Sequence, residues 1–120
     1  MDERLEREVE MLYSQVCQGL GDPKRLLILY VLSRGPQNVS ELARELGVPQ
    51  PTVSRHLAVL RERSLVETRR EGATVYYSLP DDRIIQALDL MRAMLRDRMV
   101  NRADLAEFRA LGSTQKSDSE

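Results

Sequence analysis

A short polar segment, residues 50–56, places side chains that could do chemistry at close spacing. It reads QPTVSRH, and the Arg55 guanidinium can donate two hydrogen bonds to the O6 and N7 atoms of guanine. Short polar side chains near a helix N-terminus can reach bases or phosphates. These residue types predict contacts with double-stranded DNA. The candidate contact residues are Gln50, Thr52, Ser54, Arg55 and His56.

Most of these side chains also have a plain structural interpretation. Arg55 suits a phosphate contact or a solvated surface charge as well as a base contact. Thr52 and Ser54 are residue types that cap helix N-termini. His56, the only histidine in the sequence, neighbours apolar residues, so a packed and hydrogen-bonded role competes with a DNA contact. The residue types alone leave these alternatives open.

Two short amphipathic patterns with a break between them would position this segment. Gly47 suits the left-handed turn that ends a helix, and Pro51 suits the first position of the next one. Asn38 followed by Glu41 has the spacing of a capping box. Helix, turn and helix with a polar, basic outer face predict a helix-turn-helix whose second helix, about residues 51–63, enters the major groove. The apolar positions that would face the core are Val39, Leu42, Ala43, Leu46, Val53, Leu57 and Leu60.

A β-hairpin is predicted directly after this second helix. Residues 65–70 and 74–79 are rich in β-branched and aromatic residues, and they flank Glu71-Gly72-Ala73, a short connection that contains glycine. A hairpin in this place can lie along the DNA backbone as a wing. An ordinary charged hairpin is the alternative. The candidates for phosphate or minor-groove contact are Arg69, Arg70 and Thr74.

Three further helices are predicted outside the helix-turn-helix. Residues 3–19 carry one apolar stripe, and Asp22-Pro23 begins a helix that runs to about Leu32. Residues 80–82 begin a long last helix. A three-helix core with a hairpin can cover only part of the first and last helices, so pairing of two chains through these helices is expected. Met91, Met94 and Met99 fit interface packing, with an inducer pocket as the alternative.

The net charge of −1 hides an uneven distribution. Residues 20–79 hold nine basic and six acidic side chains, a balance of +3. Residues 1–19 balance at −3 and residues 80–120 at −1. The basic part therefore coincides with the helix-turn-helix and the hairpin, which favours a nucleic-acid partner.

Composition argues against several other classes of protein. One cysteine permits no disulfide within the chain and fits a reducing cytoplasm. The sequence has no apolar run of about 18 residues and no signal-peptide pattern, so neither a membrane partner nor export is expected. One histidine and no phosphate-cradling glycine loop argue against an enzyme. No Trp and one Phe leave few aromatic side chains for stacking on single-stranded bases.

Four motifs together resemble the ArsR family of bacterial winged helix-turn-helix repressors over about residues 12–95. They are Asp22-Pro23-x-Arg25, Glu41-Leu42-Ala43, Val53-Ser54-Arg55-His56-Leu57-x-x-Leu60 and Glu71-Gly72-x-x-Val75-Tyr76-Tyr77-Ser78-Leu79. The resemblance implies a homodimer that binds a palindromic operator, often represses its own operon, and is released when an inducer binds or a thiol reacts.

The metal sites that the resemblance would imply are absent from the matching positions. One family variant has a Cys-Val-Cys triplet where this sequence has Asn38, Val39 and Ser40. Another has two Asp or Glu and two His side chains, and the matching residues here are Asp81, Arg83, Met94 and Asp97. Neither set offers the thiolate or imidazole ligands of a zinc or thiophilic metal site. No metal site and no cofactor are predicted.

The sequence therefore leaves two alternatives for the signal that releases the repressor: an unidentified small-molecule inducer and a reaction at Cys17. Cys17 lies in the first predicted helix near the expected dimer seam. A thiol sensor is one interpretation, and a small buried apolar residue is the other.

The prediction is a mostly α-helical winged helix-turn-helix with a β-hairpin wing, in the order α-α-α-α-β-β-α, that forms a homodimer through its first and last long helices. Residues 1–100 form the DNA-binding and dimerisation domain, residues 101–111 an extra helix, and residues 112–120 a disordered tail. The expected function is that of a cytoplasmic, sequence-specific transcriptional repressor with a non-metal signal. The alternatives are a thiol-responsive repressor acting through Cys17 and a winged-helix protein-interaction module without DNA binding.

Overall fold

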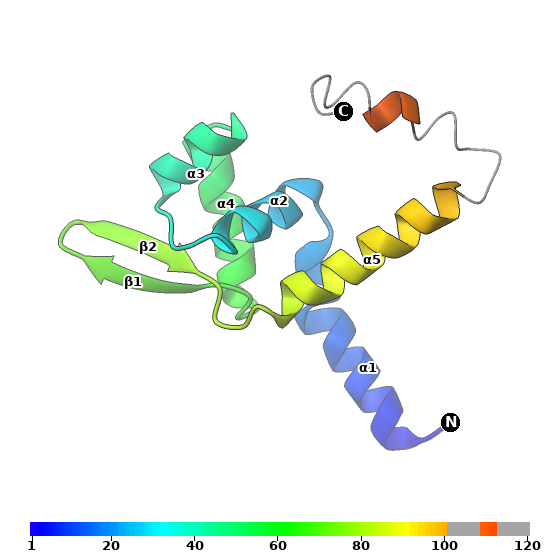
Figure 1. Ribbon diagram of the computed structural model, residues 1–120. Helices are drawn as coiled ribbons and strands as arrows, with labels where there is room; N and C mark the ends of the chain where they lie inside the picture. Colours follow the sequence, from blue (N-terminus) through cyan, green and yellow to red (C-terminus); the bar gives the residue numbers. More distant parts are fainter. Residues whose placement is uncertain (101–108, 113–120) are drawn as a thin grey trace. The chain divides into compact units, whose positions relative to one another are not determined.

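A computed structural model describes residues 1–100 and 109–112. The described part is mostly helical with one antiparallel hairpin (Figure 1), as predicted. It divides into two units, residues 1–82 and residues 83–120. In chain order the elements are α1 (Glu3–Gln15), the 3₁₀ helix η1 (Cys17–Leu20), α2 (Pro23–Leu32), α3 (Val39–Leu46), α4 (Gln50–Glu62), β1 (Glu67–Glu71), β2 (Thr74–Ser78) and α5 (Arg83–Val100).

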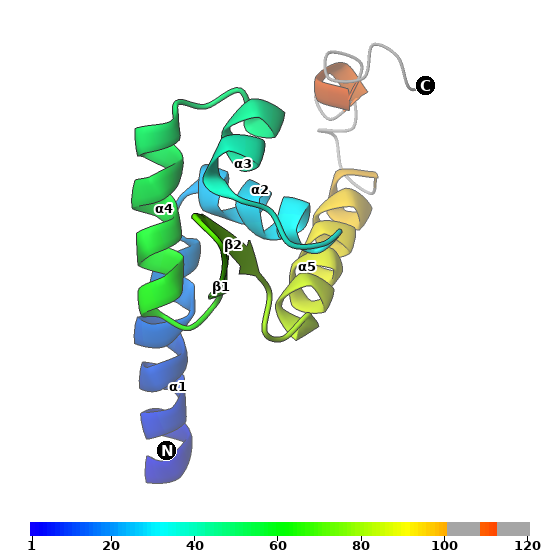
Figure 2. The same cartoon turned by 90° about the vertical axis from the view of Figure 1, so that its left-hand side faces the viewer.

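The core of the first unit lies where α2, α3 and α4 meet (Figure 2). Helix α2 supplies four buried residues, more than any other element, because its sequence PKRLLILYVL is apolar over most of its length. Five of the seven apolar positions predicted for α3 and α4 are buried, and the other two, Val39 and Leu46, are half-buried. The buried apolar side chains of this unit are Ile28, Leu29, Val31, Leu32, Leu42, Ala43, Val53, Leu57, Leu60 and Val66.

Local signals set both ends of α3. The Asn38 side chain accepts from the Glu41 amide at 2.8 Å, and the Glu41 side chain accepts from the Asn38 amide at 2.9 Å, which completes the predicted capping box. Gly47 ends the helix at φ 65°, in the left-handed region that glycine adopts without a steric penalty. The turn between α3 and α4 is therefore encoded by residues within it.

The first helix ends earlier than predicted. Helix α1 stops at Gln15, and residues Cys17–Leu20 form a tighter 3₁₀ turn, so the prediction of one helix over residues 3–19 is wrong in its last turn. Gly19 of this turn packs closely against Arg63, since a Cβ atom on Gly19 would lie 2.7 Å from the Arg63 Cδ atom. Arg63 also donates from Nη1 to the Ser14 carbonyl at 3.1 Å. Arg63, at the C-terminal end of α4, therefore contacts both the end of α1 and the 3₁₀ helix η1.

The hairpin has a shorter first strand and a tighter loop than predicted. Glu71 pairs with Thr74, so only Gly72 and Ala73 lie in the loop, and β1 starts at Glu67 rather than at residue 65. The connection before it holds Ser64 at φ 60° and buries Val66 in the core. Tyr77 of β2 exchanges two backbone hydrogen bonds with Gln37, at 3.1 and 2.8 Å. This bridge attaches the hairpin to the loop that precedes α3.

Helices α1 and α5 expose large apolar side chains to solvent. Helix α1 has no buried residue, although Leu5, Val9, Leu12 and Tyr13 are apolar or aromatic. In the second unit, α5 exposes Leu90, Met91, Met94, Leu95 and Val100. Residues 109–112 are helical. The rest of the helix predicted over residues 101–111 and the tail from residue 113 lie outside the described residues, so those domain boundaries stay predictions.

The substitution Leu57→Ala should lower the free energy of unfolding by about 2–5 kcal/mol, because it leaves a cavity at a fully buried position of α4. Urea denaturation followed by circular dichroism measures the change. Arg44→Ala, on an exposed position of α3, is the control and should stay within about 0.5 kcal/mol of the wild type. Equal losses for the two variants would contradict this assignment of the core.

Candidate nucleic-acid interface

Helix α4 separates its apolar and polar residues onto two faces. Val53, Leu57 and Leu60 are buried, whereas Ser54 and Arg55 are exposed on the opposite side. Gln50 is exposed too. The predicted outward orientation is therefore correct for these three residues, whereas Thr52, for which it was also predicted, is half-buried. Because the apolar stripe holds α4 against the core, its polar side chains are presented on a fixed scaffold.

The hydroxyl groups of Thr52 and Ser54 are not used for capping. Helix α4 begins after Pro49 and has no side-chain hydrogen bond at its N-terminus, so the capping interpretation of these two residues is wrong. Neither hydroxyl bonds to another residue in the part of the chain that the structure describes. Thr52 is half-buried, and Ser54 is exposed. Both hydroxyls can therefore donate to a ligand.

Gln50 is positioned by the neighbouring helix. Its Nε2 atom donates to the Ser40 Oγ atom at 3.2 Å, which links the first turn of α4 to the first turn of α3. The sequence patterns did not reveal this hydrogen bond. It restricts the rotamers of the Gln50 side chain and leaves its amide oxygen and second N–H group open to a partner.

His56 takes the packed, hydrogen-bonded role. The Arg25 Nη1 atom lies 3.2 Å from the His56 Nδ1 atom, and Arg25 also donates from Nε to the Gly19 carbonyl at 2.7 Å. A guanidinium can only donate, so Nδ1 must accept and the imidazole proton must stand on Nε2. The ring is neutral in this arrangement. Burial lowers the pKa of His56, the cationic side chains of Arg25, Arg55 and Lys24 lower it further, and Asp22 opposes them.

Arg25 is a site residue whose contacts the sequence patterns did not predict. It lies in the motif Asp22-Pro23-x-Arg25, and its side chain joins η1 to α4 across the N-terminal end of α2. The Asp22 side chain accepts from the Lys24 amide at 2.8 Å as the N-cap of α2, and this hydrogen bond lowers the pKa of Asp22. The motif was visible in the sequence, but the partners of Arg25 are distant along the chain.

The two hairpin arginines differ in their surroundings. Arg69 forms an ion pair with Glu71, with 2.7 Å between Nη2 and Oε2. Arg70 is exposed and has no hydrogen bond or ion pair with another described residue. Successive residues of a strand point to opposite faces, so Arg70 shares a face with Thr68, and Arg69 shares the other with Glu71. Thr74 is half-buried opposite Glu71.

Comparison with known proteins identifies the family of this chain. The family model described as a bacterial regulatory protein of the arsR family matches residues 22–68. The HTH-type transcriptional regulator NmtR of Mycobacterium tuberculosis is 39% identical over 85 residues, which cover 71% of this chain and 71% of NmtR. The chain belongs to the ArsR family. The HTH-type transcriptional regulator KmtR of the same organism is 41% identical to this ArsR-family chain over 75 residues, which cover 62% of the chain but only 58% of KmtR.

Solved structures share the fold of this ArsR-family chain. The transcriptional repressor BigR from Xylella fastidiosa matches with a TM-score of 0.66 and 30% identity, over 78% of this chain and 96% of BigR. A homodimeric winged helix-turn-helix DNA-binding domain from Mycobacterium bovis matches with a TM-score of 0.71 and 25% identity, over 86% of this chain and 94% of that domain. The predicted winged helix-turn-helix fold is thus confirmed, and the named relatives are transcriptional regulators rather than enzymes.

The structure also gives the positions of the remaining candidate residues of this ArsR-family chain. Asn38 uses its side chain to cap α3, and Cys17 is exposed on η1, so its interpretation as a buried apolar residue is wrong for the single chain. Over residues 1–100 and 109–112, no three His, Cys, Asp or Glu side chains converge in a way that could hold a metal ion. No helix in that same part of the chain is long and apolar enough to cross a membrane.

The free energy of unfolding should fall as the pH drops below about 6.5, the ordinary pKa of histidine, because folding lowers the pKa of His56. As the pH falls, His56 is protonated in the unfolded chain before it is protonated in the folded chain. The stability that depends on neutral His56 is therefore complete above about pH 6.5 and decreases as the pH falls towards the lower pKa of the folded state. Urea denaturation between about pH 7.5 and 5, the range in which histidine titrates, measures the slope.

His56→Asn is the matched comparison, because its Oδ1 atom can accept from Arg25 in place of Nδ1 without titrating. The lowered pKa of Asp22 acts below its ordinary value of 3.8, outside this window. A wild-type slope equal to that of His56→Asn would show that the Arg25–His56 contact does not hold the ring neutral.

Proposed function

We propose that this ArsR-family chain is a sequence-specific, DNA-binding transcriptional repressor that acts in the cytoplasm as a homodimer. The observation that carries the proposal is the outer face of α4, where Ser54 and Arg55 are exposed on a helix whose opposite face is buried. A helix held in this way can enter the major groove without rearrangement. A winged-helix module used only for protein contacts would not need hydrogen-bond donors concentrated on this face.

Base reading is assigned to the first turns of α4. Arg55 can donate two parallel hydrogen bonds to one guanine, and a Gln side chain can make a similar pair with adenine. Gln50 is already oriented by Ser40, which lowers the entropy cost when its amide binds. Thr52 and Ser54 offer hydroxyl donors to bases or phosphates. His56 acts indirectly, by connecting α4 to Arg25.

The wing contact is assigned to Arg70 ahead of Arg69. Glu71 neutralises much of the Arg69 charge, whereas Arg70 has no ion pair with a described residue. A free guanidinium gains more from a phosphate than one that must first leave a carboxylate. Thr74, half-buried at the start of β2, contributes at most a hydroxyl at the edge of this contact.

Dimerisation is assigned to α1 and α5. Both helices carry several exposed leucines or methionines, and clusters of this kind favour burial against another chain. The domain from Mycobacterium bovis that shares this fold is homodimeric. A two-fold axis would present two α4 helices to half-sites about one DNA turn apart, or a multiple of that, which calls for a palindromic operator.

The signal that releases the repressor is proposed to be an unidentified small molecule rather than a metal ion. An alternative signal is a reaction at Cys17, whose thiol is exposed on η1. Oxidant treatment with Cys17→Ser as the control separates the two, because only the thiol mechanism requires the cysteine.

Selection of duplexes from a randomised library by the full chain tests DNA binding and identifies an operator. On the selected duplex, Arg55→Ala should cost roughly 1–3 kcal/mol and should relax the preference at one base pair of each half-site, because the variant cannot bind the guanine there. Fluorescence anisotropy on the selected duplex and on single-base variants measures both effects.

Arg44→Ala, on the exposed face of α3, is the charge-matched control for this experiment. An equal reduction in affinity for every duplex would make Arg55 a phosphate contact instead of a base reader. Failure of the wild-type chain to select or bind any duplex at low salt would refute the proposed function and favour the protein-interaction module.

Leu12→Glu should convert the dimer to a monomer at micromolar concentration, because it places a charge in the apolar stripe of α1. Analytical ultracentrifugation measures the mass. Arg7→Gln changes the net charge by the same amount on the opposite face of α1 and should leave the mass unchanged. A dimer that survives Leu12→Glu would place the interface elsewhere.

A further inference from the structure

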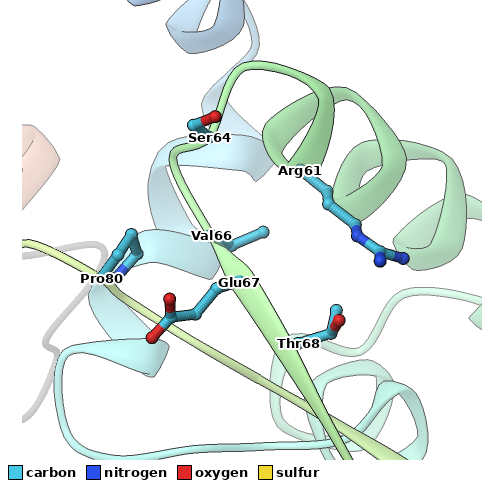
Figure 3. Close-up of a pocket in the computed structure, with 6 residues that line it drawn as sticks. All are labelled: Arg61, Ser64, Val66, Glu67, Thr68 and Pro80. Carbon is cyan, nitrogen blue, oxygen red and sulfur yellow. The ribbon is translucent and has the colours of Figure 1, made fainter.

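Two hollows lie between α4 and its hairpin, and Arg61 lines both of them. The first, of about 420 Å³, is bordered by Arg61, Ser64, Val66, Glu67, Thr68 and Pro80 (Figure 3). The second has the same volume and is bordered by Ser54, Ala58, Arg61, Glu62 and Tyr77. Arg61 is the residue that the two hollows share, and each hollow is bordered by residues of α4 and of the hairpin. We refer to the two hollows together as the helix–wing groove.

The helix wall of this groove follows a regular pattern. Ser54, Ala58 and Arg61 stand at i, i+4 and i+7, so they form one stripe along α4. The first two side chains are small, which lets an extended chain approach the helix closely. The stripe ends in a guanidinium that has no hydrogen bond or ion pair with another described residue. Figure 3 shows the Arg61 side chain extending from α4 along the hollow, towards the side where Thr68 stands.

The hairpin wall adds hydroxyl donors. Thr68 and Tyr77 are directly opposite each other in the strand register, so their side chains share one face of the hairpin, the face that borders the groove. Arg70 lies on that same face, two residues after Thr68. Ser54, Arg61, Thr68 and Tyr77, which all carry hydrogen-bond donors, therefore line the helix–wing groove. Glu62 and Glu67 also line the groove, one in each hollow, and would repel an anion beside them.

A DNA duplex supplies a chain of the right chemistry. Phosphate oxygens only accept hydrogen bonds, and each phosphate carries a negative charge. When α4 lies in the major groove and the wing reaches the adjacent minor groove, the sugar-phosphate strand that separates the two grooves must pass between helix and wing. The helix–wing groove lies at this position, between α4 and the hairpin.

From this arrangement we infer that the helix–wing groove is a phosphate-binding site in which Arg61 clamps the strand between the major and minor grooves. The inference rests on the proposed DNA binding and adds a contact to it, since Arg61 is distinct from the base-reading end of α4. Ser54 and Tyr77 assist with hydroxyl donors, and Ala58 leaves room for the strand. The contact sets the register of the repressor on its operator and carries no sequence preference of its own.

Salt dependence on two duplexes tests the clamp. The full chain and Arg61→Gln are compared by fluorescence anisotropy on the selected operator and on a duplex of scrambled sequence. Removal of one phosphate-binding charge should lower the slope of log K against log salt by about one unit for each subunit bound. Between roughly 50 and 200 mM salt, this removes about a three- to fourfold change in affinity for each phosphate that the variant no longer binds. The change in slope caused by Arg61→Gln should be the same on both duplexes.

Two control variants separate a phosphate contact from a structural role. Arg61→Lys keeps the charge and should restore most of the slope, because a lysine can also bind phosphate as a point charge. Arg7→Gln removes one positive charge from α1, outside the helix-turn-helix and the hairpin, and should leave the slope unchanged.

Single methylphosphonate substitutions then locate the contact. Neutralising one particular phosphate in each half-site should weaken DNA binding by the wild-type chain and should not change DNA binding by Arg61→Gln. The clamp would be overturned if the salt slope of Arg61→Gln equalled that of the wild type, or if each methylphosphonate weakened both proteins to the same extent. Either result would leave the proposed function intact. If the wild-type chain binds neither duplex, the proposed function itself fails and the clamp fails with it.

Discussion

Burial of the apolar stripe on α4 against α2 and α3 is the constraint on which the rest of the structure depends. Val53, Leu57 and Leu60 are almost completely inaccessible to water, so the helix cannot rotate about its axis without exposing at least one of them. Exposure of one such side chain would cost on the order of 1.5–3 kcal/mol, a large share of the stability of a small domain. Fixing this rotation fixes where Ser54 and Arg55 point. The polar face of α4 is thus a consequence of the core beneath it.

Hydrogen bonds from two arginines join this helix to the start of the chain. Arg25 connects the Gly19 carbonyl to His56, and Arg63 donates to the Ser14 carbonyl. Both acceptors lie at the junction of α1 and η1, immediately after the stripe assigned to dimerisation. The first helix therefore cannot change its direction without disturbing contacts in the middle and at the C-terminal end of α4. In a two-fold dimer this linkage relates the spacing of the two recognition helices to the packing of the two first helices.

The hairpin is placed by a different kind of contact. The two backbone hydrogen bonds between Gln37 and Tyr77 connect it to the loop before α3, so the wing is attached to the helix-turn-helix. This connection keeps Thr68 and Tyr77 opposite the α4 stripe. The donors of the helix–wing groove come from segments that are separated along the sequence, and no single motif contains them. Arg70 extends the same surface, whereas Arg69 pairs with Glu71 on the other face.

Signals that act over a few residues could be read from the sequence alone. The Asn38–Glu41 capping box, the turn at Gly47, the apolar stripe of α4 and the hairpin around Gly72 each depend on near neighbours, so their residue types and spacing determined the fold class and the outward face of α4. The tertiary structure decided what depends on distant partners. It packed Gly19 against Arg63, and it paired His56 with Arg25 and Arg69 with Glu71. It also brought Arg61 close to Thr68 and Tyr77. A local pattern specifies the face on which a side chain lies, but only packing specifies which side chain from elsewhere in the chain it meets.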